Sequence, residues 1–245
     1  MSDTPWLWIP RPRPAARLRL VCLGPAGAGA SSFGRWPALA PPEIEVAVVS
    51  LPGREGRLDE PAIDRFDALI DALSRHVPLD PPYALYGHSL GGQLAFTLAQ
   101  RASARPAWLG LGACRPPSAP RSGPPLSSLD DATFLLELER RYNGIPAMLH
   151  TDKELQALFL PSLRADYAVL ESRPALAGPP LDVRARLYAG ERDPDLRPEH
   201  LRGWDQHLRP APPLDVVPGD HFFLRTPEGA ARVLTRLSAD LGLAI

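Results

Sequence analysis

The sequence has little of several features that would point to a particular partner or compartment. Its two cysteines, Cys22 and Cys114, are too few for a disulfide framework and lack the spacing of metal ligands. The net charge of −1 gives no electrostatic footprint for nucleic acid or for an anionic membrane surface. No uncharged apolar run reaches the ~18 residues of a membrane-spanning helix. Four arginines interrupt the apolar stretches before residue 30, so we expect no export signal and a cytoplasmic protein (Arg11, Arg13, Arg17 and Arg19).

What the sequence does contain is enough apolar surface for a sizeable core, with 44% hydrophobic residues in 245. That length suits one α/β domain, and we expect residues 1–245 to form it. Proline is frequent at 31 residues, but it clusters between the periodic segments. We therefore interpret the proline clusters as stiff connections rather than disorder.

Apolar runs typical of buried strands alternate with helical patterns along most of the chain. The predicted strands span residues 17–23, 45–50, 83–86, 107–112, 183–189 and 214–217, with a short edge strand through 6–9. Helices are expected near 33–39 and over 61–77, from 89 to about 103, over 198–208, and over 227–241 with Thr226 as its cap. This alternation predicts an α/β fold with a mostly parallel sheet and helices on both faces.

Residues 115–180 interrupt the alternation with helices alone. We expect helices over 129–142, over 152–160 with Thr151 and Glu154 as a capping box, and over 162–173 after Pro161. One interpretation is a helical lid inserted over the carboxyl edge of the sheet. The other is an ordinary helical layer that packs its apolar face into the core.

The stretch Tyr83–Gly92 reads as a strand, a tight turn and a helix start, with Ser89 at the apex. Its residues 87–91 match GxSxG, in which glycines let the backbone crowd around a strained serine whose hydroxyl projects above a sheet. The alternative is a glycine-rich turn with a capping serine. The apolar strand before the motif and the apolar-periodic helix after it favour a nucleophile.

A loop of small residues follows the first long strand, over residues 24–32. Its backbone N–H groups could cradle a phosphate, as in a dinucleotide fold, or donate to an oxyanion. The dinucleotide motif GxGxxG requires a third glycine where Ser32 stands, and the next strand ends at Ser50 rather than at an acidic residue. We therefore expect two backbone donors for an oxyanion, the N–H groups of Leu90 and Ala26.

A serine hydroxyl needs a base to take its proton, and an imidazole needs a carboxylate to fix its tautomer. His221 lies in a loop after a late strand, where the last member of a Ser–Asp–His order belongs. The other histidines fall in predicted helices, in the 115–180 segment or in the turn itself (His76, His88, His150, His200 and His207).

The acid should follow the preceding strand, where both Asp193 and Asp195 stand. We favour Asp193, because it is nearer the strand end and Pro194 fixes the turn after it. An aspartate in an Asx-turn and a loop histidine bonded to the backbone are the alternatives for Asp193 and His221. Ser89, Asp193 and His221 in this order, each just beyond a predicted strand, favour a catalytic triad.

The chain resembles the stand-alone type II thioesterases of polyketide and non-ribosomal peptide synthesis, within the α/β-hydrolase fold. The resemblance rests on five stretches, residues 25–27, 51–55 (LPGRE), 87–92 (GHSLGG), 160–167 (LPSLRADY) and 219–224 (GDHFFL). The last two are more specific than GxSxG. The first departs from the family, which usually has an aromatic residue or histidine before Ala-Gly-Gly, whereas Pro25 precedes Ala26 here.

The resemblance implies hydrolysis of acyl groups from the phosphopantetheine arm of acyl or peptidyl carrier proteins, with acyl-CoA as a second substrate. It implies no cofactor and no metal, and it makes the 115–180 segment the family's lid. A carboxylesterase or lipase with the same triad is the alternative enzyme, and a non-catalytic hydrolase-fold binding module is the alternative of another class. Arg54, Arg57 and Arg164, which lie in the motif loops, are candidates for docking an acidic carrier surface.

Overall fold

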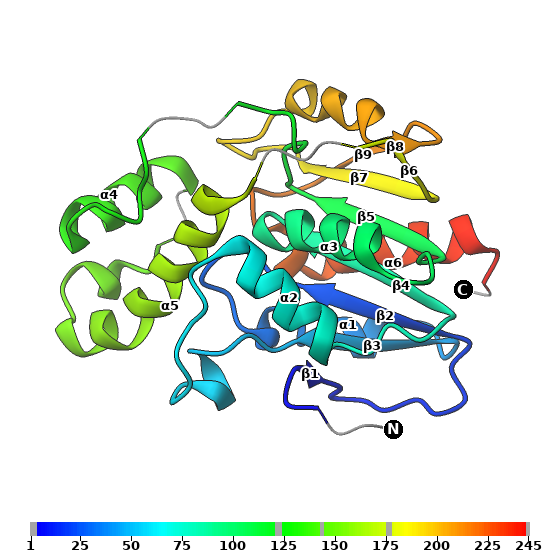
Figure 1. Ribbon diagram of the computed structural model, residues 1–245, viewed down its shortest axis with the longest axis horizontal. Coiled ribbons are helices and arrows are strands. Elements are labelled where there is room, and N and C mark those ends of the chain that lie inside the picture. Colours follow the sequence, from blue (N-terminus) through cyan, green and yellow to red (C-terminus); the bar gives the residue numbers. More distant parts are fainter. Residues whose placement is uncertain (1–3, 121–123, 143–144, 175–177, 244–245) are drawn as a thin grey trace.

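The computed structural model describes residues 4–120, 124–142, 145–174 and 178–243. A seven-stranded sheet runs through it in the order β1-β3-β2-β4-β5-β7-β9 (Figure 1). Its strands are Leu7–Trp8 (β1), Leu18–Leu23 (β2), Ile44–Val49 (β3), Tyr83–His88 (β4), Trp108–Gly112 (β5), Ala185–Gly190 (β7) and Leu214–Val217 (β9). The edge strand β1 is antiparallel to β3, and the other pairings in this sheet are parallel. The predicted mostly parallel sheet is confirmed.

Continuous apolar sequence explains why these strands lie in the middle of the molecule. Every residue of β3, β4 and β5 is buried, as a parallel sheet covered on both faces requires. The helices α2 (Phe66–His76) and α3 (Leu90–Arg101) cover one face, and α1 (Trp36–Leu39) and α6 (Pro227–Leu241) cover the other (Figure 1). A separate two-stranded sheet pairs β6 (Leu181–Asp182) with β8 (Leu208–Arg209).

The strand register brings the carboxyl ends of the central strands to one edge. Leu23 of β2 pairs with Gly87 of β4, and His88 of β4 pairs with Gly112 of β5. At the far side, Gly190 of β7 pairs with Val217 of β9. The loops after β2, β4, β7 and β9, which carry the candidate site residues, therefore leave the sheet at the same edge.

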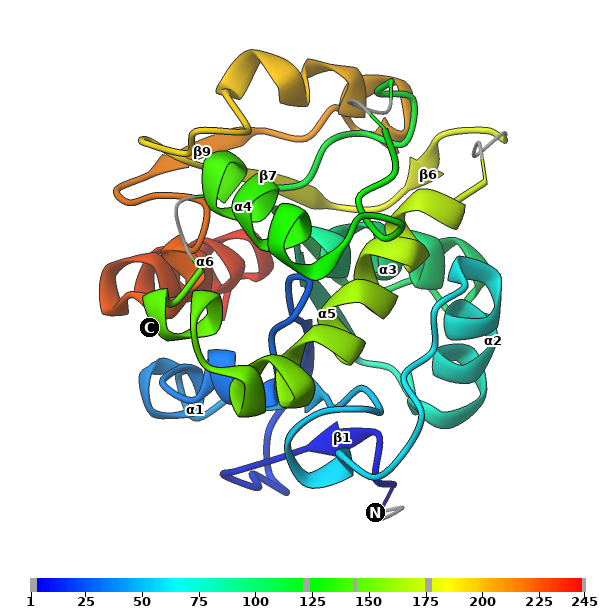
Figure 2. The same cartoon turned by 90° about the vertical axis from the view of Figure 1, so that its left-hand side faces the viewer.

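Helices lie across this edge, as Figure 2 shows from that side. They are α4 (Asp131–Tyr142), the 3₁₀ turn η3 (Ala147–His150) and α5 (Lys153–Ser172). In the described part of residues 115–180, which omits 121–123, 143–144 and 175–177, there is no strand. These helices bury a hydrophobic cluster of their own, separate from the main core around the sheet (Leu126, Phe134, Leu135, Leu138, Leu149, Leu160, Leu163 and Tyr167).

Several helix boundaries differ from the predicted ones. The break expected at Pro161 is wrong, because α5 continues through it and buries Leu160 and Leu163 in the second cluster. Its N-cap is Asp152 rather than Thr151, and the Asp152 carboxylate accepts the N–H groups of Glu154 and Leu155 at 2.9 and 3.0 Å.

The helix predicted from Pro61 begins only at Phe66. There the Ser172 hydroxyl of α5 accepts the Phe66 N–H at 3.0 Å, so a side chain distant in sequence satisfies the free donor at this helix end. The predicted helix over 198–208 is a 3₁₀ helix, η4 (Pro198–Gln206). The last helix begins where the sequence predicts, with the Thr226 hydroxyl accepting the Gly229 N–H at 3.0 Å.

Candidate active site

Ser89 lies on the sharp turn between β4 and α3, at backbone angles of φ +54° and ψ −114°. A non-glycine residue is strained there, and such strain is typical of a nucleophile elbow. The turn can close only because its neighbours lack side chains. A Cβ on Gly91 would lie 2.1 Å from the Leu23 carbonyl oxygen, and one on Gly87 would lie 2.1 Å from the Gly91 carbonyl oxygen. The glycines of the motif thus bring α3 against the end of β2.

His221 and Asp193 meet across 28 residues of sequence. The imidazole Nδ1 lies 2.7 Å from the Asp193 Oδ2, and the two residues are only 3% and 6% exposed. The other Asp193 oxygen accepts the N–H groups of Asp195 and Leu196 at 2.9 and 3.0 Å. Asp193 therefore forms the Asx-turn considered above and orients His221 at the same time. With Nδ1–H donated to the carboxylate, Nε2 is left to accept a proton.

Asp195, the second candidate acid, also lines the cavity that holds Ser89 and His221, but it is bound to a different residue. Its carboxylate pairs with Arg115 at 3.6 Å, and Arg115 also donates to the Asp195 backbone carbonyl at 2.6 Å. The structure therefore brings Asp193 to His221 and ties Asp195 to the loop after β5.

Among the described residues, neither of the two predicted oxyanion donors has a hydrogen-bond acceptor. Leu90 is the first residue of α3, so its N–H has no acceptor within the helix and lies at the positive end of the helix dipole. In the loop after β2, the Ala28 N–H donates to the Pro25 carbonyl at 3.1 Å and the Gly27 N–H to Asp166 at 2.7 Å. Among the residues that the structure describes, the Ala26 N–H has no acceptor.

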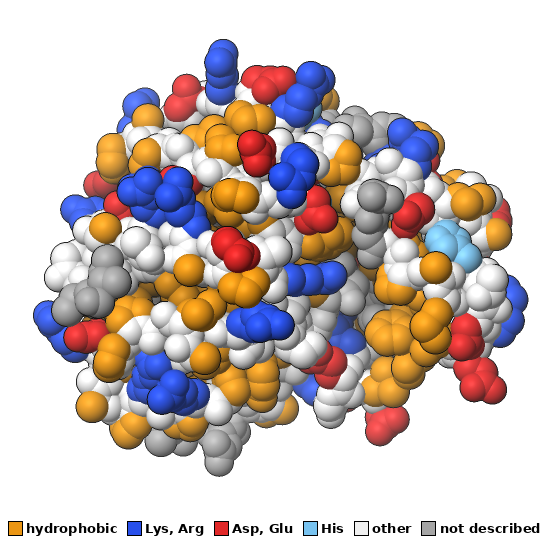
Figure 3. Space-filling view, turned by 180° about the vertical axis from the view of Figure 1, so that it is seen from behind, with side chains coloured by type: hydrophobic (Ala, Val, Ile, Leu, Met, Phe, Trp, Pro, Cys, Tyr) orange, Lys and Arg blue, Asp and Glu red, His pale blue; other side chains and the backbone are white. Residues whose placement is uncertain are grey.

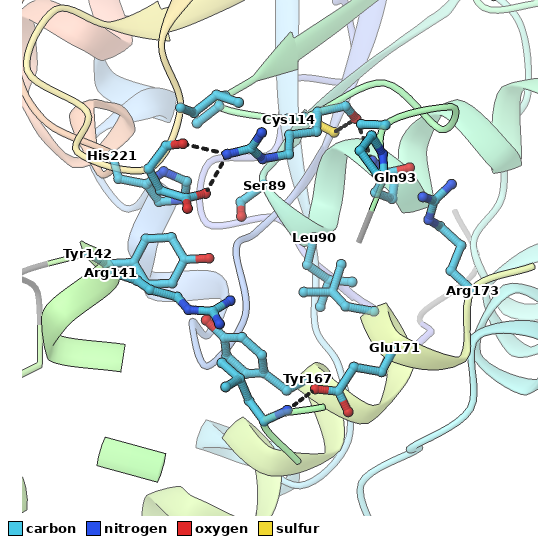
Figure 4. A pocket seen from close by; sticks show the side chains of 18 of the residues that line it. Ser89, Leu90, Gln93, Cys114, Arg141, Tyr142, Tyr167, Glu171, Arg173 and His221 are labelled. Atoms are coloured by element: carbon cyan, nitrogen blue, oxygen red, sulfur yellow. Dashed lines mark hydrogen bonds and ion pairs between the residues drawn. The ribbon is translucent and has the colours of Figure 1, made fainter. Parts of the chain in front are cut away.

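Ser89 and His221 line one cavity of about 380 Å³ under α4 and α5 (Figure 4). Most of its other wall residues are apolar and come from the start of α3, the loop after β5, and the helices α4 and α5 (Leu90, Ala113, Pro116, Pro125, Leu126, Tyr142, Tyr167 and Leu170). The Tyr142 ring packs 4.7 Å from the His221 ring. An apolar cavity that begins at a serine hydroxyl can hold the acyl chain of a substrate.

His88, which the sequence placed only in the turn, supports His221 from below. Its Nε2 lies 2.6 Å from the His221 backbone carbonyl and its Nδ1 lies 3.0 Å from the Tyr86 hydroxyl. Burial, and next the neighbouring His221, hold the pKa of His88 well below its ordinary value. The ring is therefore neutral, and since a carbonyl only accepts, Nε2 carries the proton and Nδ1 accepts from Tyr86.

Comparison with known proteins identifies the family. The model of the thioesterase domain family matches residues 18–241. The chain belongs to the thioesterase family. Because a match of this extent covers nearly the whole chain, the family predicted from the motifs is confirmed, and with it the expected α/β-hydrolase architecture.

Several members of this thioesterase family are similar over almost their full length. The gramicidin S biosynthesis protein GrsT of Aneurinibacillus migulanus is 32% identical over 86% of this chain and 84% of its own. Thioesterase PikA5 of Streptomyces venezuelae is 35% identical over 91% of this chain and 84% of its own. The structure of the type II thioesterase BorB from the borrelidin biosynthetic cluster superposes with a TM-score of 0.83 at 32% identity, covering 96% of this chain and 97% of BorB.

The three arginines predicted to dock a carrier protein all form ion pairs within this thioesterase. Arg54 and Arg57 are only 7% and 8% exposed. Arg54 pairs with Asp166 and Arg57 with Glu60, while Arg164 donates to Asp131 and to two backbone carbonyls. For Arg54 and Arg57 the prediction is wrong, because their buried guanidinium groups fasten loops near the site. For Arg164, whose side chain is 27% exposed, docking stays a prediction. On the face that α1 and α6 cover, basic and acidic side chains are interspersed (Figure 3).

The remaining polar groups near Ser89 include no second nucleophile of comparable reactivity. Cys114 lines the cavity, but burial raises its pKa to about 12, so the thiol stays protonated at neutral pH. Among the described residues, no three His, Cys, Asp or Glu side chains are grouped so that they could hold a metal ion. Within the same residues, no helix is both long and apolar enough to cross a bilayer.

Proposed function

We propose that this thioesterase is a type II, editing enzyme that removes acyl groups from the phosphopantetheine arm of acyl or peptidyl carrier proteins. Acyl-CoA, which carries the same arm, is the second substrate class. The observation that carries the proposal is the His221–Asp193 pair beside a strained Ser89, in a chain similar to thioesterases of antibiotic biosynthesis over nearly its whole length. Ser89, Asp193 and His221 are the catalytic residues in this proposal.

In the first half of the reaction, the Ser89 Oγ attacks the thioester carbonyl while His221 Nε2 takes its proton. The carbonyl oxygen becomes an oxyanion, which the N–H groups of Leu90 and Ala26 stabilise. The carbon–sulfur bond then breaks, and the imidazolium returns its proton to the departing pantetheine thiolate. The products are a free thiol and an ester of Ser89.

In the second half, water attacks the ester carbonyl and His221 takes a proton from it. The same two N–H groups stabilise the second oxyanion. When the carbon–oxygen bond breaks, His221 protonates Ser89 and the carboxylic acid leaves. Asp193 stabilises the imidazolium in both halves, because its buried carboxylate lies on the Nδ1 side.

The 115–180 segment is the lid in this proposal. Tyr142 of α4 and Tyr167 and Leu170 of α5 roof the cavity that begins at Ser89. The acyl chain would lie among these side chains. The pocket that they close limits the access of water to the carbonyl, so that water enters chiefly for the second half of the reaction. A cytoplasmic location is part of the proposal, since carrier-protein synthetases make their products there.

A direct test measures release of free thiol from acylated carrier protein by the purified chain and by Ser89→Ala. Ser238→Ala, at a buried serine of α6, is the matched control. We expect the control to hydrolyse the thioester like the unmodified chain and Ser89→Ala to lose at least about 10⁴-fold in rate. Equal rates for Ser89→Ala and the control would refute the proposal. Faster cleavage of an oxygen ester than of the matched thioester would instead identify a carboxylesterase.

A further inference from the structure

Asp166 of α5 holds the oxyanion loop with a buried, fully occupied carboxylate. Its Oδ2 accepts the Gly27 N–H at 2.7 Å and the Arg54 Nη1 at 2.6 Å, while its Oδ1 accepts the Arg54 Nη2 at 2.8 Å. Asp166 is 1% exposed and Arg54 is 7% exposed. Three segments distant in sequence thus meet at one carboxylate: the loop after β2, the loop after β3, and the lid helix.

Stability alone gives a weak reason for such a pair. Removing two charges from water costs about as much as their attraction returns, so a buried ion pair contributes little net stabilisation. What this pair adds is geometry, because a bidentate guanidinium fixes the carboxylate and the carboxylate fixes one backbone N–H. Arg54 also donates to the Ala28 carbonyl at 3.3 Å, on the same loop.

The neighbouring Glu55 fastens the far end of the same loop. Its carboxylate accepts the Ala30 N–H at 2.8 Å and the Ser31 N–H at 3.2 Å. Arg54 and Glu55, adjacent residues of one sequence motif, therefore clamp the loop on both sides of Ala28.

Ala26 lies where this clamp has its effect. It is partly buried and packs against both hydrophobic clusters, the main core and that of the lid helices. The Gly27 N–H is directed at Asp166 and the Ala28 N–H at Pro25, so of these three the Ala26 N–H is the one without an acceptor among the described residues. Gly27 has φ +72°, a conformation open to glycine that lets adjacent N–H groups point in different directions.

We propose that Asp166 and Arg54 are positioning residues of the oxyanion hole, which fasten the lid helix α5 to the loop so that the Ala26 N–H is aimed before substrate binds. The proposal rests on the proposed function. Neither residue lines the cavity that holds Ser89. Their effect on the rate is indirect. They fix the peptide group between Ala26 and Gly27, and this group orients the adjacent Ala26 N–H.

Asp166→Asn tests the proposal, because its NH₂ group replaces one acceptor oxygen and leaves either Gly27 or Arg54 unpaired. Asp240→Asn on α6 is the matched control. The Asp240 carboxylate also accepts two bonds from one guanidinium, that of Arg186 at 2.9 and 2.7 Å, and a third from the Trp108 indole at 2.9 Å. It lies outside the lining of the cavity.

We expect Asp166→Asn to lower kcat for an acyl-pantetheine thioester by about 10–100-fold, less than the 10²–10³ of losing an oxyanion donor outright. KM should stay within about twofold, because the interaction acts in the transition state. Arg54→Lys keeps the positive charge and leaves the Gly27 acceptor in place but loses the bidentate contact, so its kcat should fall less. The kcat of Asp240→Asn should fall least. Should Asp166→Asn not fold, Arg54→Lys against Asp240→Asn decides the same question.

A second readout needs no activity. The Gly27 amide should exchange with deuterium much faster in Asp166→Ala than in Asp240→Ala, since alanine leaves Gly27 without its buried acceptor. Equal kcat values for Asp166→Asn and the control, a loss in KM alone, or an unchanged Gly27 amide would overturn the proposal. A wild-type chain without thioesterase activity would instead refute the proposed function, and the exchange rate would still decide whether Asp166 holds the loop.

Discussion

Two hydrophobic clusters divide this molecule, and they support different parts of the site. The larger surrounds the sheet and holds Ser89, Asp193 and His221 at the ends of buried strands. The smaller lies within the α4–α5 segment and supplies part of the wall of the cavity that holds Ser89. Ala26 and Leu170 pack against both. In the proposed function, the chemistry therefore depends on the sheet, the choice of substrate on the helical segment, and the oxyanion donor on the junction between them.

The largest effects on rate should come from the sheet-edge region. Asp193→Asn removes the carboxylate acceptor at 2.7 Å from the His221 Nδ1, so the imidazole can adopt the wrong tautomer. We expect kcat to fall on the order of 10³–10⁴-fold. Asp195→Asn is the matched control, since that carboxylate pairs with Arg115, and it should stay within about tenfold of the unmodified chain.

Steady-state thioester hydrolysis measures both variants. If Asp195→Asn lost as much activity as Asp193→Asn, or more, Asp193 would not be the carboxylate that orients His221 during catalysis.

Changes on the helical segment should alter selectivity instead of chemistry. Leu170→Trp adds bulk to the wall of a cavity of about 380 Å³. We expect kcat/KM for long acyl chains to fall roughly tenfold while acetyl thioesters are hydrolysed as before. Leu136→Trp, at a residue of α4 that is 63% exposed, is the control and should change neither. A uniform loss across chain lengths would place Leu170 in the chemical step and break the division between the two regions.

The smallest effect is on the pH dependence of stability, and it comes from His88, whose ring contacts the His221 backbone carbonyl. Because burial holds the pKa of His88 well below its ordinary value, the unfolded chain binds a proton near pH 6.5 that the folded chain does not. Stability is therefore full above the unfolded pKa and falls as the pH drops below it, by about 1.4 kcal/mol per pH unit. Burial also lowers the pKa of His207, which adds a smaller dependence in the same direction.

Denaturant unfolding between pH 8 and pH 5 measures this term. His88→Gln should lack the His88 part of the dependence, whereas His76→Gln, at an exposed residue of α2, should keep it. A pH dependence unchanged in His88→Gln would contradict the assignment of a neutral, buried His88.

The same division explains which features the sequence could predict. In a parallel sheet, the residues just beyond the carboxyl ends of the strands lie at one edge. Their order along the chain was therefore enough to select Ser89, Asp193 and His221 as a candidate triad. Asp193 and Asp195 were harder to separate, and the position nearer the strand end together with Pro194 favoured the residue that contacts His221.

Contacts between distant segments were beyond the sequence. The bond from Gly27 to Asp166 spans 139 residues, and no local pattern marks it, although both residues lie in stretches that resemble the family. For the same reason Arg54 could be mistaken for a docking residue. The helix break expected at Pro161 was wrong. Proline usually interrupts a helix, but here the packing of Leu160 and Leu163 in the second cluster outweighs that local preference.

The central claim is that Ser89 carries the acyl group between thiol release and hydrolysis. Mass spectrometry of the chain quenched during turnover of an acylated carrier protein measures this directly. The account predicts a mass increase equal to the acyl group on the peptide that contains Ser89, and a larger fraction of it in His221→Asn if deacylation is slowed more than acylation. An acyl group found on another residue, or thioester hydrolysis by Ser89→Ala at the unmodified rate, would contradict the account.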